Sequence, residues 1–317
     1  MPVEIIVNQI LILAIVALVG VIASKAGVIT SEGKDFLAKI IFNVTLPSML
    51  LASFGSIDAT PRLLTNSLEF IGLSFFSIML LFIAGTAASS ILKLKGEESA
   101  IFRIHSMMGN IIYLAFPVIY SLYGQEGILY GSIFTIVSNV VLWTLGIVII
   151  AGNSKISVKE SFKYIINPNT IAILTGFCLF LLHIKLPKII IDSVGGIGST
   201  NTYLSILYIG SVLFYSKTGR YLKNINIYVL SFNKMILVPF LLTGIFWLAA
   251  AYLNLHFDKL VLSVLILESA MPCMVNVVII AKILGMDDAP AVANVFVSTI
   301  LSIITLPIVL IFLSVLK

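Results

Sequence analysis

Apolar runs of membrane-spanning length recur along the whole chain. A helix needs about 20 apolar residues to cross the hydrocarbon core of a bilayer. Charged residues, or clusters of Gly, Asn and Pro, separate ten such segments, at residues 5–23, 36–54, 66–92, 101–122, 128–151, 166–184, 200–215, 227–253, 260–284 and 290–316. We therefore expect an all-α membrane protein with ten transmembrane helices.

Charge is too scarce for a soluble protein of this size. Only 10% of the 317 residues are Asp, Glu, Lys or Arg, and 60% are hydrophobic, whereas soluble domains carry roughly 25% charged residues. A surface so poor in charge is not kept in water. The composition argues against a soluble enzyme, a nucleic-acid-binding protein and a disordered chain, and the connections between ten spans are too short for a soluble catalytic domain.

Basic residues fall unevenly on the two alternating sets of loops. One set holds fourteen, namely Lys25, Lys34, Lys39, Lys93, Lys95, Arg103, Lys155, Lys159, Lys163, Lys217, Arg220, Lys223, Lys234 and Lys282. The other holds five, namely Arg62, Lys185, Lys188, Lys259 and Lys317. Cytoplasmic loops carry the excess of Lys and Arg. We therefore expect the first set in the cytoplasm and both chain termini on the extracytoplasmic side.

The two halves of the chain share a common layout. Residues 20–51 and 176–207 align without gaps at an offset of 156 positions, although few residues are identical. Many transporters consist of two such halves with opposite topology. The sequence predicts a first five-helix repeat over 1–151, a short cytoplasmic linker over 152–164 and a second five-helix repeat over 165–317.

Prolines interrupt matching spans of the two halves. Pro117 and Pro272 are 155 positions apart and lie in the middle of their spans, among small and polar residues that include Asn110 and Asn276. A single proline is read as an ordinary kink, because proline removes one backbone donor and clashes with the preceding turn. Paired interruptions instead indicate a transport site, since they expose backbone groups that bind ions and polar ligands. We expect the substrate there, with both asparagines as donors.

Glu268 is the one carboxylate well inside a predicted span. An uncompensated charge near the bilayer centre costs at least about 2.5 to 3.5 kcal/mol on insertion scales. The residue is either a neutral carboxyl bonded to a neighbouring helix or a carrier of the coupling ion or proton. We favour the second reading, because Pro272 lies one helical turn further on. Asn139 and Asn294, also 155 positions apart, are expected to assist it, with helix–helix hydrogen bonding as the alternative.

The chain offers few groups for other chemistry. Neither a nucleophile–base pair nor a set of metal ligands is recognisable in the spans, so we expect no enzymatic activity, no cofactor and no bound metal. Of the three histidines, His105 begins its span beside Arg103, where a proton relay is a minor hypothesis. No Lys or Arg falls at a span centre, so helix dipoles and amide donors would have to hold an anion there.

Short strings along nearly the whole chain resemble the auxin efflux carrier family. The strings are Gly20-Val21-Ile22, Phe42-Asn43-Val44-Thr45-Leu46-Pro47, Gly109-Asn110, Phe116-Pro117-Val118, Tyr123-Gly124, Asn167-Pro168, Gly176 and Glu268-Ser269-Ala270-Met271-Pro272 followed by Asn276. They are most similar to the prokaryotic branch with malate and malonate permeases, within the fold group of the bile acid, arsenite and riboflavin transporters.

This resemblance implies ten helices in two inverted repeats, with the fourth and ninth helices broken and crossing at their prolines. Spans three to five and eight to ten would move in an elevator-like manner against a scaffold of the other four spans. Asn43 would line the scaffold side of the site, and the scaffold would also join two copies of the chain into a homodimer.

The function expected from these features is secondary active transport of a small organic anion, such as malate or malonate, across a prokaryotic plasma membrane. A proton or Na⁺ would be the coupling partner. The alternatives are a uniporter or exporter of aromatic, auxin-like monocarboxylates, a passive channel, and a receptor that uses the same fold.

Overall fold

The computed structural model describes residues 3–55, 57, 60–146, 148–149, 166–215, 223–253, 257–283, 286–287 and 289–315, and their regular elements are all helical. The α-helices are α1 (Val3–Lys25), α2 (Ser31–Ile40), α3 (Leu46–Gly55), α4 (Pro61–Ile91), α5 (Gly96–Met107), α6 (Phe116–Val141), α9 (Pro168–Leu181), α10 (Lys188–Ser199), α11 (Asn201–Tyr215), α12 (Ile225–Phe232), α13 (Val238–Leu253), α14 (Lys259–Ser269), α15 (Asn276–Ile283) and α16 (Ala289–Val315). The predicted linker over 152–164 lies outside the described residues.

Among the described residues, five helical stretches are long and apolar enough to cross a membrane, namely Ser31–Gly55, Pro61–Ile91, Ile111–Gly146, Ile225–Leu253 and Ala289–Leu313. The expectation of an all-helical chain with membrane-spanning segments is therefore confirmed. The count of ten spans stays a prediction. Helix α1 covers the first predicted span, and the others coincide with shorter helices or with helices that are interrupted.

The longest of these stretches contains parts of two predicted spans. Gly124 lies within α6 with φ 61° and ψ −146°, a conformation that ends the helical path at that residue. Glycine adopts a positive φ without the steric penalty that a Cβ brings. The sequence places a span boundary between residues 122 and 128, and the backbone turns at this glycine.

Three prolines in the long helical stretches follow turns of π-helix, whereas Pro307 lies inside α16 without one. The turns are η1 (Ile41–Thr45), η2 (Ile111–Ala115), η3 (Leu142–Gly146) and η6 (Asn233–Leu237). Pro47, Pro117 and Pro239 each come two residues after the end of such a turn. A proline ring clashes with the carbonyl four residues earlier and has no N–H to donate to it. In all three cases that carbonyl belongs to the wider π turn, which lets the helix continue past the proline.

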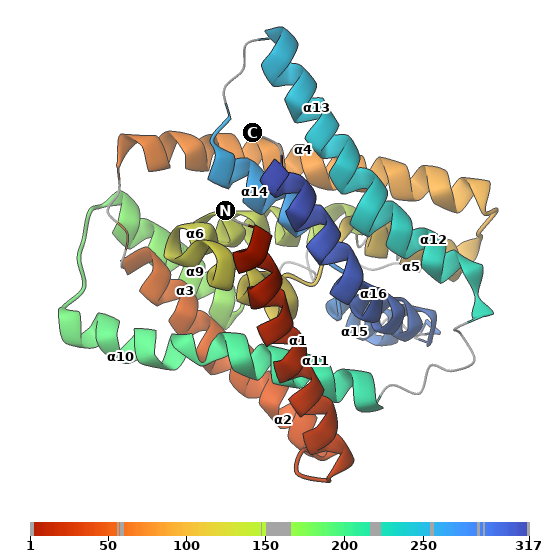
Figure 1. Ribbon diagram of the computed structural model, residues 1–317, viewed down its shortest axis with the longest axis horizontal. Coiled ribbons are helices and arrows are strands. Elements are labelled where there is room, and N and C mark those ends of the chain that lie inside the picture. Colours follow the sequence, from red (N-terminus) through yellow and green to blue (C-terminus); the bar gives the residue numbers. More distant parts are fainter. Residues whose placement is uncertain are drawn as a thin grey trace.

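The first spans of the two halves pack reciprocally. Helix α1 packs against α11, and α9 packs against α3 (Figure 1). The first predicted span of each half therefore contacts the second predicted span of the other half. Glycines permit this close approach, because a Cβ on Gly20 would clash with the backbone of Leu207 and one on Gly176 would clash with the Phe54 side chain. The two pairs of helices are linked through η1, which contacts both α9 and α11.

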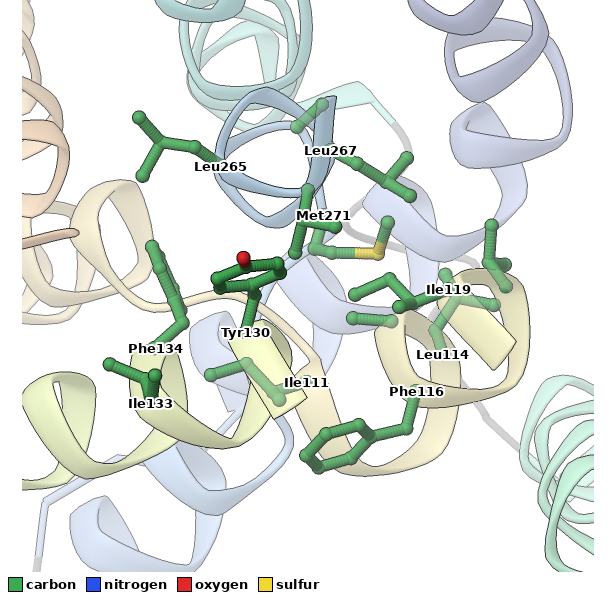
Figure 2. Close-up of a cluster of buried hydrophobic side chains, with 14 of the residues drawn as sticks. Ile111, Leu114, Phe116, Ile119, Tyr130, Ile133, Phe134, Leu265, Leu267 and Met271 are labelled. Atoms are coloured by element: carbon green, nitrogen blue, oxygen red, sulfur yellow. The ribbon is translucent and has the colours of Figure 1, made fainter. Parts of the chain in front are cut away.

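The largest hydrophobic core extends from these helices to η2, α6 and α14. Figure 2 shows side chains of η2, α6 and α14 converging around Met271 and the Tyr130 ring. These residues are buried members of the largest hydrophobic core, which also includes Phe116, Phe134 and Leu267. Met271 is not in a helix, since it lies in the segment that follows α14. The cluster therefore holds an irregular segment within an apolar environment.

Candidate functional site

Two helix interruptions lie against each other in the interior. The first covers residues 108–110, between α5 and η2, and the second covers 270–275, between α14 and α15. The backbone N–H of Asn110 donates a hydrogen bond of 2.8 Å to the carbonyl oxygen of Pro272. Irregular backbone is tolerated at membrane depth only where its polar groups find partners inside the protein. Each interruption supplies such partners to the other.

Gly109 lets the two segments meet closely. A Cβ at this position would lie 3.0 Å from Cβ of Met271 and 3.2 Å from the carbonyl oxygen of Glu268. A second backbone bond, from Met274 N–H to the Met108 carbonyl at 3.3 Å, joins the same two segments. Glycine at position 109 therefore allows the close packing of the two interruptions.

Asn110 presents a free donor at this crossing. Its Oδ1 accepts a hydrogen bond of 3.4 Å from the backbone N–H of Tyr113, which caps the start of η2. Its side chain is buried, with 2% of its surface exposed, and Nδ2 has no hydrogen-bond partner in the part of the chain that the structure describes. A buried donor without a partner is costly. The arrangement is typical of a group that is satisfied by a ligand.

The first interruption is not where the sequence analysis places it. Pro117 lies at the start of α6, past η2, whereas the helix is broken at residues 108–110. The π turn of η2 accommodates the proline ring, so the helix continues through it. Pro272 does lie within an interruption, as expected. The helices therefore meet at Asn110 and Pro272, and not at two prolines.

Glu268 is buried beside the crossing in the last turn of α14. Only 1% of its surface is exposed, and neither carboxylate oxygen has a hydrogen-bond partner among the described residues. A Cβ on Gly131 of α6 would lie 3.3 Å from Oε1, so this glycine makes room for the carboxylate. The reading of Glu268 as a carboxyl bonded to a neighbouring helix has no support in these contacts.

A histidine and an asparagine extend the polar group toward α16. His105 is fully buried, its Nε2 lies 3.2 Å from the Met274 carbonyl oxygen, and its Nδ1 lies 3.1 Å from Nδ2 of Asn294. A carbonyl only accepts, so Nε2 carries the proton, and Nδ1 accepts from the amide. The ring is therefore neutral and holds the second interruption to α16. Asn294 also lines a cavity bordered by Glu98, Asn224 and Asn226.

Lys234 is the residue that the sequence analysis misassigns. It is counted there among the cytoplasmic loop residues, but it lies in η6 within the apolar stretch Ile225–Leu253 and is 1% exposed. Its Nζ donates a hydrogen bond of 3.1 Å to the carbonyl oxygen of Ser106, near the end of α5. Among the described residues no carboxylate forms an ion pair with it, so the charge of Glu268 acts on it only at longer range. Lys234 is the eighth residue of the predicted span 227–253, and this position could have identified it from the sequence as a basic residue within a span.

The other predicted site residues lie further from the crossing or at its edge. Asn276 is half-buried at the first position of α15. Asn139 is half-buried near the end of α6. Asn43 is exposed in η1, and its Nδ2 donates to the carbonyl oxygen of Lys39 at 2.9 Å. Among the described residues no three His, Cys, Asp or Glu side chains are grouped to hold a metal ion.

An aromatic pair borders the crossing on the side of α11. The rings of Tyr113 and Tyr208 have centroids 4.6 Å apart and an interplanar angle of 41°. Tyr113 follows Asn110 by three residues, and both tyrosines are buried in a small cluster with Ile41 and Ile209. The aromatic pair therefore lies one π-helical turn from Asn110 along η2.

Known proteins with similar sequences are transporters. The membrane transport protein family matches residues 5–163 and 154–310. An uncharacterized transporter of Methanocaldococcus jannaschii is 23% identical over 313 residues, covering 94% of this chain and 96% of the relative. An uncharacterized transporter of Methanothermobacter thermautotrophicus is 22% identical over 308 residues, covering 95% and 96%. The resemblance noted in the sequence is confirmed, and the chain belongs to the membrane transport protein family, as a transporter and not an enzyme.

Proposed function

We propose that the protein is a secondary active transporter of small organic anions, with a dicarboxylate such as malate or malonate as the favoured substrate. The observation that carries this proposal is the buried, unpartnered Nδ2 of Asn110 at the crossing of two helix interruptions. An anionic carboxylate would accept a hydrogen bond from this amide and would be stabilised by nearby half-helix N-termini. Pro272 and Asn276 would complete the substrate site, with Pro117 and Asn43 at its margins.

We propose further that the chain consists of two inverted five-helix repeats, 1–151 and 165–317, joined by the linker 152–164. The reciprocal packing of α1 with α11 and of α3 with α9 supports this, because it is the pattern expected when two related halves face each other about a common axis. In this account both termini are extracytoplasmic, in the plasma membrane, and the α1, α3, α9 and α11 unit is a scaffold through which two copies form a homodimer.

Alternating access would proceed by an elevator-like movement of the remaining helices along this scaffold. A small pocket lies at this boundary, with Leu13 and Ala17 of α1 and Ile206 of α11 on one side, and Leu114 and Leu306 on the other. Its lining is mainly apolar. Movement along an apolar boundary does not require ion pairs to be broken. The apolar lining therefore supports an elevator-like movement along the scaffold.

Glu268 would carry the coupling proton or cation. Burial without hydrogen-bond partners makes its charge costly, so it would be neutralised before the site changes its exposure. Asn294 would assist through His105, and Asn139 would assist from α6. Coupling requires the ion and the substrate to favour the same conformations, each by its own differential affinity.

A second candidate is uniport or export of an aromatic monocarboxylate, and the Tyr113 and Tyr208 pair favours it. Aromatic rings stack in offset or tilted arrangements at centroid distances of about 4.5 to 7 Å. A flat substrate could insert beside Tyr208 with its carboxylate at Asn110. Uptake of labelled malate and of labelled indole-3-acetate, each with the other acid as unlabelled competitor, would separate the two candidates. Uptake of the aromatic acid that malate does not inhibit, without uptake of malate, would replace the dicarboxylate by the aromatic acid as the substrate.

Counterflow in proteoliposomes tests the proposed function. Vesicles loaded with unlabelled malate should accumulate external labelled malate transiently, because a carrier exchanges substrate through one alternating site. A thermal-shift screen of the purified protein against mono- and dicarboxylates, at two pH values and with and without Na⁺, would first identify the acid to use, since a bound ligand stabilises the folded state. Non-saturating flux without counterflow would identify a channel, and tight binding without flux would identify a receptor.

A further inference from the structure

The end of α5 is a half-helix C-terminus inside the protein. Helix C-termini leave their last carbonyls without intrahelical partners and carry a partial negative charge. The Ser106 carbonyl would normally accept from the N–H four residues later, but that residue is Asn110, whose N–H donates to Pro272 instead. Ser106 O is therefore free for another donor, and it receives Nζ of Lys234 at 3.1 Å.

Lys234 reaches this carbonyl from the opposite half of the chain. It is the second residue of η6, the π turn that precedes Pro239, and η6 packs against α5. Its side chain is among the largest fully buried ones in the protein. The ammonium therefore lies where half-helix C-termini of transporters bind a coupling cation.

Three titratable side chains lie within electrostatic range of this ammonium. Glu268 of α14 attracts it, His105 of α5 is neutral because of its two hydrogen bonds, and Cys273 lies in the second interruption. A buried cation persists only when an opposite charge or hydrogen bonds compensate it. The Ser106 carbonyl supplies the hydrogen bond, and Glu268 supplies an opposite charge at longer range. The two ionised side chains together would bring the site close to zero net charge.

We propose that the Lys234 ammonium is a resident cation of the transport site, occupying the end of the α5 half-helix in place of a transported metal ion. The inference rests on the proposed function, and it assigns the coupling chemistry of that site. With Lys234 present, an organic anion is compensated without Na⁺, and a proton on Glu268 is the remaining partner. Without the ammonium, Glu268 and the Ser106 carbonyl would form an uncompensated oxygen site open to Na⁺.

Purified protein with Lys234→Gln tests this directly, by thermal unfolding in NaCl, KCl and choline chloride at equal ionic strength. The wild type should have the same Tm in all three salts. The variant should have a lower Tm in choline, and NaCl should raise it, because Na⁺ fills the vacated position. Lys188→Gln is the matched control, since that side chain is 90% exposed and should leave Tm unchanged. A wild-type protein stabilised specifically by Na⁺, or a variant that unfolds like the wild type in every salt, would overturn the proposal.

Two further measurements keep the proposal decisive. If Lys234→Gln does not fold, the double variant with Glu268→Gln removes both charges and should fold again, because breaking a buried pair costs more than replacing it. A double variant that also fails to fold would show that Lys234 acts only by packing, and would overturn the proposal. In proteoliposomes, malate uptake by Lys234→Gln should fall by at least about tenfold in choline and recover in Na⁺. If the wild type transports no organic anion while Tm follows the expected pattern, the proposed function fails and the resident cation stands.

Discussion

Thr45 Oγ1 donates a hydrogen bond of 2.9 Å to Oδ1 of Asn201, and these two residues are 156 positions apart. That separation is the offset at which residues 20–51 and 176–207 align. Positions that correspond in the two halves therefore touch each other. Two equivalent residues meet only at the axis that relates two halves, so this contact supports the inverted repeat more strongly than the few shared residues do.

Thr45→Val should destabilise the protein. Valine keeps the shape of threonine but leaves Oδ1 of Asn201 without its donor in a buried position. Leaving a buried acceptor unsatisfied costs about 1 to 3 kcal/mol, which lowers the unfolding temperature in detergent. Ser48→Ala is the control, because that hydroxyl bonds only to the Val44 carbonyl of its own helix. Equal melting temperatures for the two variants would mean that the contact between the halves contributes nothing.

Gly109→Ala should disrupt the crossing of the interruptions. The new methyl group would press on Met271 and on the Glu268 carbonyl, so the two segments would have to separate. Overpacking of this kind costs about 1 to 3 kcal/mol, and transport should fall more than stability because the substrate site itself is displaced. Gly72→Ala serves as the comparison, since no atom lies within 4 Å of a Cβ built there. Normal transport by Gly109→Ala would show that the crossing of the two interruptions is not part of the substrate site.

Local features of the sequence predicted much of the fold. Runs of apolar residues located the membrane-spanning stretches, and the predicted boundary before residue 128 contains Gly124, where α6 turns. Such features depend on neighbouring residues alone. Pro117 shows where local reasoning stops, because a proline either breaks a helix or follows a π turn, and hydropathy does not distinguish the two.

The candidate site was predicted only in part for a related reason. Asn110, Pro272 and Glu268 were identified because polar or helix-breaking residues are unusual inside spans. Lys234 was missed because a basic residue near a span end is normally read as part of a loop. Its role depends on Ser106 and Glu268, which are distant in sequence. Contacts of that kind follow from tertiary packing.

The ion pair of Arg62 and Asp258 makes the stability of the protein depend on pH. Burial alone would raise the pKa of Asp258, but hydrogen bonds from Arg62 and from the amides of Leu260 and Val261 lower it below its usual value. A lowered pKa contributes stability above the pKa of the unfolded chain, about 3.9, and this contribution is lost as the pH falls through the folded value.

Asp258→Asn should therefore lower Tm at pH 7 and have less effect near pH 3, where the wild-type carboxylate is being protonated. The asparagine still caps α14, so the difference reports the charge. Because the Arg62 side chain is 74% exposed, the effect should be small and should shrink further in high salt. A Tm difference that is constant from pH 3 to pH 7 would contradict the assignment.

Concentrative uptake by Glu268→Gln in proteoliposomes tests the central claim most directly. Under an imposed proton or Na⁺ gradient the wild type should accumulate labelled substrate above equilibrium. The variant should fail to accumulate it yet still exchange internal for external substrate, because glutamine resembles the neutral carboxyl that accompanies the loaded site. Glu69→Gln, at an exposed position of α4, should behave like the wild type. Gradient-driven accumulation by Glu268→Gln equal to that of the wild type would contradict the coupling role and the account built on it.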